Sequence, residues 1–148
     1  MPHATTYALI MLAAGIGIPV LAALNAALGQ YIGSALAAGA VICFVGFLIC
    51  TTVVTLSGQL SHLGNLISAP KHLFLAGGFM AFYVITITIV APKFGIGNAI
   101  FFVLLGQLVS AAIVDHFGLF GAQVSPLSLT RAAGVAVMAA GVWLTQIA

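Results

Sequence analysis

Charge is what this sequence most lacks. Only 3% of its 148 residues are charged, with three Lys or Arg and one carboxylate, Asp115, whereas a soluble globular protein carries about 25%. So few charges cannot cover a surface that faces water, and 64% of the residues are hydrophobic. Lipid is therefore the solvent for most of this chain, and the sequence predicts an integral membrane protein.

The shortage of carboxylates also excludes several functions. A catalytic triad or a two-metal site needs acidic groups that converge with other polar residues, and Asp115 is the only acidic side chain. A net charge of +2 without a cluster of cations is too small to indicate nucleic-acid binding. We therefore expect no enzyme, no metal or other cofactor, and no nucleic-acid partner.

Cysteine is scarce as well. Cys43 and Cys50 lie seven residues apart in one apolar run, which places them about 10 Å apart along a helix and too far apart for a disulfide. They also lack the spacing of a zinc site. We expect both to pack as small apolar residues.

In place of charged segments, the sequence contains long apolar runs. Five runs are long enough to cross a bilayer, and they span about residues 6–28, 36–56, 73–90, 96–114 and 129–147. They lack the alternation of barrel strands, and an open sheet would leave backbone groups unpaired in lipid. The expected fold is an all-α bundle of about five transmembrane helices. Because no linker resembles a domain boundary, residues 1–148 are expected to form a single transmembrane domain.

The positive charges leave the orientation nearly undecided. With five spans the termini lie on opposite sides, so Lys71 and Arg131 share the side of the N-terminus and Lys93 lies on the other side. Lys and Arg favour the cytoplasmic side, but a difference of one charge is a weak preference. Two hypotheses stay open: an antiparallel, dual-topology homodimer, or a single orientation with the N-terminal side in the cytoplasm.

Few polar side chains lie inside the apolar runs, and each is a candidate binding residue. They are Asn25 in the first run, Tyr83 in the third, and Gln107 and Ser110 in the fourth. Because an unsatisfied amide in hydrocarbon is costly, Gln107 should face a partner helix, a water or a ligand. Asn25 could equally bond another helix, and Tyr83 could be a packed tyrosine with one hydrogen bond.

Two further features have both a functional and a structural explanation. Pro19 removes a backbone hydrogen bond from the first run, as in discontinuous helices that line membrane binding sites, or it is a simple kink. Asp115 and His116 end the fourth run and could handle a proton or another cation. The alternative, which we favour because of its place near the membrane surface, is a solvated Asp115 or one paired with Arg131.

Small residues gather on the fifth run. Gly134 and Gly141 lie seven residues apart, and Ala136 and Ala140 lie four apart. Small residues let helices approach closely in lipid, where no hydrophobic effect drives association. This run is therefore expected to form a dimer seam, or else to pack within its own bundle.

Several short motifs occur in a fixed order along the chain. They are Gly17-Ile18-Pro19 with Asn25-Ala26-Ala27-Leu28-Gly29, Phe44-Val45-Gly46, Ala91-Pro92 with Gly95, Gly106-Gln107-Leu108 with Asp115-His116-Phe117-Gly118, and Pro126-Leu127-Ser128 with Arg131 and Gly134. In this order they resemble the YdcZ-like branch of the drug/metabolite transporter superfamily. One departure is Leu21, where that family often has a glutamine four residues before the asparagine.

The resemblance implies a small, multi-pass protein of the bacterial inner membrane, related to small multidrug resistance transporters. It also implies that the chain is a half-unit, of a kind found fused, paired or self-pairing, and that transport proceeds by alternating access around a site between two halves. The small multidrug relatives couple to protons through a glutamate in the first helix, which this chain lacks. Coupling of transport to protons would then depend on Asp115 or a histidine, or transport would not be coupled to protons.

These observations together predict a homodimeric transporter of a small metabolite or drug. Its expected partners are the lipid bilayer, a second copy of the chain and the transported solute. The alternative is a membrane scaffold, or an accessory subunit of a hetero-oligomer, that transports nothing itself.

Overall fold

In lipid, backbone groups have to be hydrogen-bonded within the chain, and helices achieve this one segment at a time. The computed structural model describes residues 2–147, with side chains from Thr5 onward, and its regular elements in that range are all helical. The α-helices are α1 (Pro2–Ile32), α2 (Ala35–Leu56), α3 (Leu75–Phe94), α4 (Ile96–Phe117) and α5 (Leu129–Ile147). Three short 3-10 helices, η1 (Leu60–Ser68), η2 (Lys71–Phe74) and η3 (Leu119–Gly121), lie in the longer connections.

Each of the five predicted runs is helical, and four segments are long and apolar enough to cross a membrane. These are Thr5–Ile32, Ala35–Leu56, Lys71–Phe94 and Ile96–Phe117. The prediction of an all-α, multi-pass membrane protein is therefore confirmed. The α5 helix has 19 residues but carries Arg131 and Gln146 near its ends, so it is less apolar than the four. That α5 also crosses the membrane stays a prediction.

The helix break expected at Pro19 does not occur. The α1 helix continues through Pro19 to Ile32; membrane helices tolerate proline where neighbouring groups satisfy the freed backbone carbonyl. The α3 helix likewise includes Pro92 and runs to Phe94, beyond its predicted end at residue 90. The chain turns instead at Gly95, whose φ of 90° is open to glycine.

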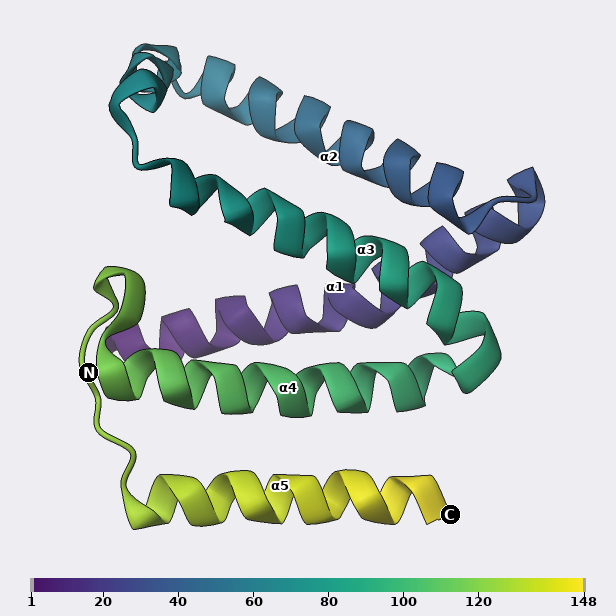
Figure 1. Ribbon diagram of the computed structural model, residues 1–148, viewed down its shortest axis with the longest axis vertical. Coiled ribbons are helices and arrows are strands. Elements are labelled where there is room, and N and C mark those ends of the chain that lie inside the picture. Colours follow the sequence, from purple (N-terminus) through teal and green to yellow (C-terminus); the bar gives the residue numbers. More distant parts are fainter. Residues whose placement is uncertain (1, 148) are drawn as a thin grey trace. The chain divides into compact units, whose positions relative to one another are not determined.

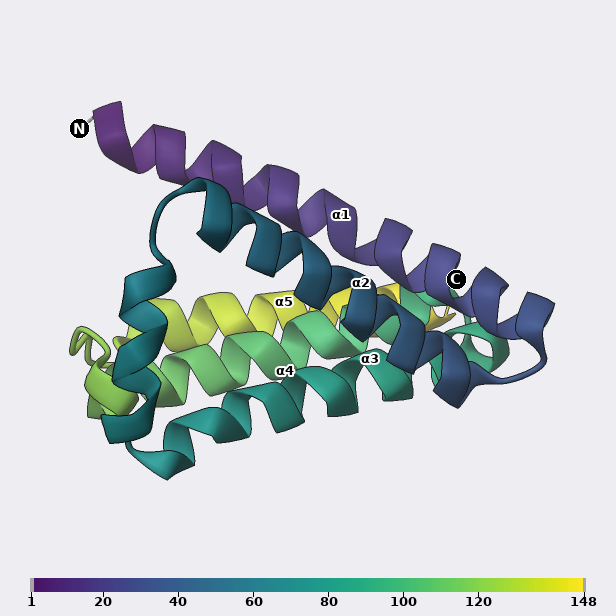
Figure 2. The same ribbon diagram turned by 90° about the horizontal axis from the view of Figure 1, so that it is seen from above.

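The chain folds into two compact units, residues 1–93 and 94–148. The first contains α1, α2 and α3, and Figures 1 and 2 show α2 doubling back after the turn that follows α1. Its buried residues are small or β-branched, apart from Asn25: Ala22, Ala26, Gly29, Ala38, Gly39, Val84, Ile87, Thr88 and Ala91. Small residues of this kind let helices pack closely where lipid supplies no hydrophobic drive.

Two glycines bring the three helices of the first unit together. A Cβ on Gly29 of α1 would lie 3.3 Å from the Cα of Ala35, which opens α2, and 3.5 Å from Cγ2 of Thr88 on α3. A Cβ on Gly39 of α2 would lie 3.3 Å from Cγ1 of Ile85 on α3. Larger residues at these positions would hold the helices apart.

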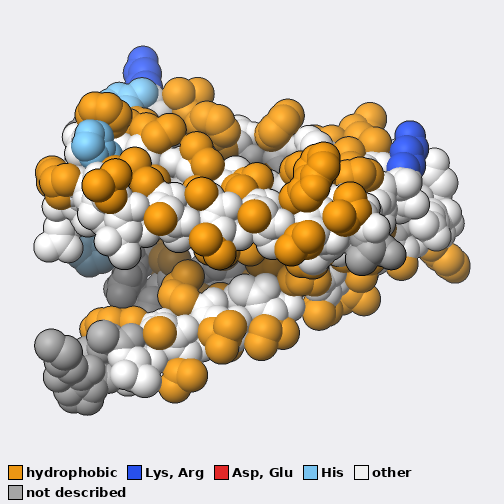
Figure 3. Space-filling model, turned by 90° about the horizontal axis from the view of Figure 1, so that it is seen from below, with side chains coloured by type: hydrophobic (Ala, Val, Ile, Leu, Met, Phe, Trp, Pro, Cys, Tyr) orange, Lys and Arg blue, Asp and Glu red, His pale blue; other side chains and the backbone are white. Residues whose placement is uncertain are grey.

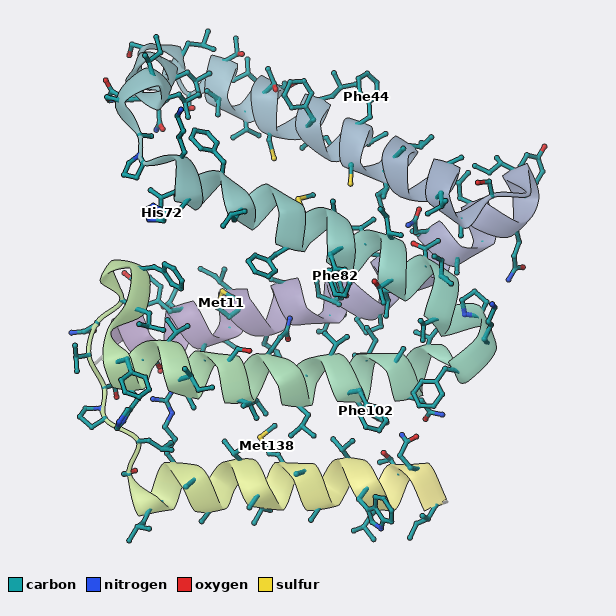
Figure 4. All side chains as sticks on the ribbon, in the orientation of Figure 1. Met11, Phe44, His72, Phe82, Phe102 and Met138 are labelled. Atoms are coloured by element: carbon teal, nitrogen blue, oxygen red, sulfur yellow. The ribbon has the colours of Figure 1, made fainter. Side chains whose placement is uncertain are left out.

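The second unit is a helical hairpin of α4 and α5. Figure 4 shows Phe102 and Met138 in the layer between these two helices. Gly118 ends α4 in the left-handed region with φ 59°, and a Cβ there would lie only 2.7 Å from Cγ2 of Val124. Glycine therefore lets the connection fold back against the end of α4.

Large apolar side chains cover the outside of the helices. Phe44, Phe82 and Met11, labelled in Figure 4, are 60%, 69% and 67% exposed. On the face drawn in Figure 3, hydrophobic side chains follow the helices and the Lys and Arg side chains stand at the ends. This surface suits hydrocarbon along the helices and headgroups or water at their ends.

The close approach of α2 to α3 at Gly39 can be tested by substitution. Gly39→Leu should lower the free energy of unfolding by about 1–3 kcal/mol, because the added side chain overpacks the contact with Ile85. The control is Gly77→Leu on α3, where a Cβ meets nothing within 4 Å. Thermal unfolding of the purified variants in detergent measures both. Equal stability of the two variants would contradict the packing described for Gly39.

Candidate functional site

The most buried polar contact of the first unit joins α1 to α3. Asn25 is 1% exposed and Thr88 is 2% exposed, and Nδ2 of Asn25 donates a hydrogen bond to Oγ1 of Thr88. The Thr88 hydroxyl in turn donates to the carbonyl oxygen of Val84, at 2.6 Å, as threonines in helices commonly do. The hydroxyl therefore both accepts and donates, and it links the amide of α1 to the backbone of α3.

Half of the Asn25 amide is left without a partner. Within the described residues, no donor reaches its buried Oδ1, and an unsatisfied buried acceptor costs about 1–3 kcal/mol. Of the two explanations for Asn25, the bond to another helix is present. The spare oxygen is itself buried, so a solute or a partner chain would reach it only if α1 and α3 moved apart.

The sequence around Thr88 gives little indication that this residue belongs to the site. It shares a buried stripe of α3 with Val84 and Ala91, at spacings of four and three residues. That periodicity indicates a buried face but does not say that the hydroxyl bonds Asn25.

Tyr83 lies at the edge of that stripe. Its side chain is half-buried, and its buried hydroxyl has no hydrogen-bond partner among the described residues. Tyr83 precedes Thr88 by five residues, which places it about 140° around the helix and about 7.5 Å along it. The two hydroxyls therefore occupy different sides of α3.

Gln107 and Ser110 belong to the second unit, and both are exposed. The face of α4 that contacts α5 carries the buried Ala112 and Asn98, whose Oδ1 accepts a hydrogen bond from Nε2 of Gln146 at 3.0 Å. Gln107 lies about 140° around the helix from Ala112 and about 180° from Asn98. It therefore projects from the side of α4 opposite α5. What covers Gln107 stays a prediction.

Asp115 forms an ion pair with Arg131, which is one of the two forms of the structural explanation favoured for it. Its Oδ2 accepts a hydrogen bond from Nη2 of Arg131 at 2.6 Å, and the two side chains are 35% and 36% exposed. An ion pair this exposed contributes about 1 kcal/mol or less. Next to it, Nδ1 of His116 accepts from the backbone N–H of Leu127 at 3.0 Å. The pair and this hydrogen bond join α4 to the start of α5, whereas proton or cation coupling stays a hypothesis.

The small residues of α5 are available for contacts outside the chain. Gly134, Ala136, Ala140 and Gly141 are all exposed, and a Cβ on Gly134 or Gly141 would meet nothing within 4 Å. The hydrogen bonds between α4 and α5 use Arg131 and Gln146. The dimer seam stays a prediction.

Grooves open in both units. In the first unit, a groove of about 360 Å³ lies at the end where α1 turns into α2, and Gln30, Ser34, Thr88 and Lys93 contribute its polar lining. An apolar groove of about 260 Å³ in the same unit is lined by residues such as Leu21 and Met80. In the second unit, about 310 Å³ of mostly apolar space lies beside His116.

Comparison with known proteins identifies the family. Residues 6–144 match the family described as "Putative inner membrane exporter, YdcZ". The chain belongs to the YdcZ family. No curated protein and no solved structure matches the chain.

Membership in the YdcZ family confirms the resemblance seen in the sequence motifs. Together with four long apolar helices, it makes this a multi-pass protein of the inner membrane and a membrane transporter of the exporter type. Proteins of this kind move solutes and are not enzymes. Asn25, Gln107 and the Asp115–Arg131 pair all lie within the matched residues.

The Asn25–Thr88 bond can be tested against a matched neighbour. Thr88→Val should lower the free energy of unfolding by about 1–3 kcal/mol, because it leaves the buried Nδ2 of Asn25 unpaired. Thr86→Val is the control, since Thr86 is exposed on the same helix. Denaturant unfolding in micelles measures both, and a loss as large for Thr86→Val would refute the special role of Thr88.

Proposed function

We propose that this YdcZ-family protein exports a small solute as a homodimer, by alternating access between two copies that span the membrane in opposite orientations. Each copy contributes five spanning helices, with α5 as the fifth. The solute contacts Asn25, Tyr83, Gln107 and Ser110. The observation that carries this proposal is the polar face of α4, formed by Gln107 and Ser110, both of which are exposed in the structure.

That face conflicts with a lipid environment. Gln107 lies near the middle of α4, a helix of 22 residues that is apolar enough to span the bilayer. Its amide would meet hydrocarbon where water is scarcest, and an amide without hydrogen bonds there is costly. Ser110 lies three residues further on, on an adjoining part of the same face. A second copy and a polar solute between the copies would satisfy both groups.

Two further observations support pairing of antiparallel copies. The Lys and Arg residues divide two to one across a five-helix topology, so either orientation meets little opposition from the positive-inside rule. The exposed small residues of α5, with Gly134 and Gly141 on one side and Ala136 and Ala140 on another, offer places where another helix can approach closely.

The polar groups also restrict the solute. The four proposed contacts are amides and hydroxyls, and the single carboxylate of the chain is already bonded to Arg131. A strongly cationic solute would have no group to neutralise it away from water. A neutral or weakly polar molecule, or one whose own charges balance, fits the site better.

The main competing function is a scaffold that holds another membrane protein through the small residues of α5. Such a scaffold would copurify with that protein in a fixed ratio, and vesicles containing the purified chain would show no flux of any solute. A transporter would purify as a homodimer and move the solutes that it binds.

The role of Gln107 can be measured once ligands are found. A thermal-shift screen of metabolites and drugs identifies ligands that stabilise the folded protein. Gln107→Leu should abolish that stabilisation while the dimer persists, because it removes an amide but keeps a side chain of similar size. Gln123→Leu, in the exposed connection before α5, is the control. An unchanged affinity in Gln107→Leu would refute the contact.

The orientation can be decided with reporters. We expect both a cytoplasm-active and a periplasm-active reporter fused to the C-terminus to be active, because both orientations insert. Adding two lysines beside Lys93 should shift the balance toward one reporter. Activity of only one reporter in the unmodified chain would rule out dual insertion.

A further inference from the structure

The first unit has positive charge and no negative charge. Residues 1–93 include Lys71 and Lys93 but no Asp or Glu, and the single carboxylate of the chain, Asp115, is bonded to Arg131. No carboxylate side chain is therefore left to pair with Lys93. Its counter-charge has to come from water, from lipid or from a solute.

Lys93 is exposed and lines one edge of a groove. The groove of about 360 Å³ is formed by the last turns of α1 and α3 and by the start of α2. Figure 1 shows the turn between α1 and α2 at the same end of this unit as the last turn of α3. Glycines at positions 29 and 33 keep side chains out of the space between the helices. The volume suffices for a small metabolite.

Three side chains of the mostly apolar lining carry hydrogen-bond donors. Lys93 has an ammonium group and Gln30 has a side-chain amide. The Ser34 oxygen accepts from the backbone N–H of Ala37 at 3.2 Å, which leaves the Ser34 hydroxyl hydrogen free to donate outward. Ser34 is the N-cap residue of α2. Three donor side chains, one of them cationic, suit an anionic oxygen group.

One residue of the groove lining, Thr88, belongs to the buried polar contact. Thr88 lines the groove and also accepts the hydrogen bond from Asn25. Five residues separate Thr88 from Lys93, or about 7.5 Å along α3. A molecule of metabolite size can therefore occupy the groove with one end at Lys93 and the other at the α1–α3 contact.

We propose that this groove binds an anionic oxygen group, a carboxylate or a phosphate, of the exported solute, with Lys93, Gln30 and Ser34 as the binding residues. This rests on the proposed function and refines it. The solute is a molecule whose own charges balance, such as a zwitterion in which the acid that binds here balances a positive group. The headgroup of an anionic lipid has the same chemistry, so the test separates the two sources.

The experiment measures the apparent melting temperature of the purified, lipid-free protein in a neutral detergent. Sodium phosphate and sodium succinate are the probes, with sodium chloride at matched ionic strength as the reference. Bound anions should raise the melting temperature. Lys93→Gln should weaken binding of both probes about tenfold, which is the loss expected for one charge-assisted hydrogen bond. Lys71→Gln, which removes the other lysine, should leave it unchanged.

A second arm places the protein in phosphatidylcholine vesicles with and without phosphatidylglycerol. A solute site predicts stabilisation by phosphate or succinate in both kinds of vesicle, dependent on Lys93. Stabilisation by phosphatidylglycerol alone would assign the groove to lipid and overturn the proposal. No stabilisation by any probe, or equal losses in Lys93→Gln and Lys71→Gln, would overturn it as well. Because the titration measures neither flux nor dimerisation, these failures would leave the proposed exporter untouched.

Discussion

Hydrocarbon offers no hydrogen bonds, and every polar group in this protein has to be understood against that constraint. The backbone meets it by forming helices. Asn25 meets it halfway, with its Nδ2 bonded to Thr88 and its Oδ1 without a partner. Gln107 does not meet it within its own hairpin, since α5 contacts the opposite face of α4. The exposed Gln107 marks the surface where we propose that a solute or a second copy binds, whereas the Oδ1 of Asn25 lies inside the first unit.

The fold class could be predicted because lipid leaves few alternatives. The chain has 3% charged residues and long apolar runs that lack the alternation of barrel strands. In lipid, such runs can satisfy their backbone hydrogen bonds only as helices. The ends of the helices were harder to predict, since Pro19 and Pro92 both lie inside helices that continue past them. A proline in a membrane helix costs one hydrogen bond, and sequence alone does not say whether the rest of the helix persists.

The site could be predicted residue by residue but not as an arrangement. Polarity inside an apolar run singles out Asn25 and Gln107, and the pairing of Asp115 with Arg131 was one of two alternatives for that carboxylate. Contacts between helices depend on rotation and register, which a sequence without a strong period does not determine. Thr88 therefore became a site residue only when the structure showed its bond to Asn25. The groove beside Lys93 was likewise invisible, because it forms from three segments distant in sequence.

The central claim is that a second copy covers the polar face of α4. The direct test is cross-linking of Ser110→Cys in native membranes, in a chain whose Cys43 and Cys50 are replaced by alanine. In an antiparallel pair, residues near the middle of a helix can meet their own counterparts across the two-fold axis. A short bis-maleimide should therefore yield a covalent dimer with Ser110→Cys, and little with Phe44→Cys on the outside of α2. A monomer with Ser110→Cys, or a dimer as abundant with Phe44→Cys, would contradict the account.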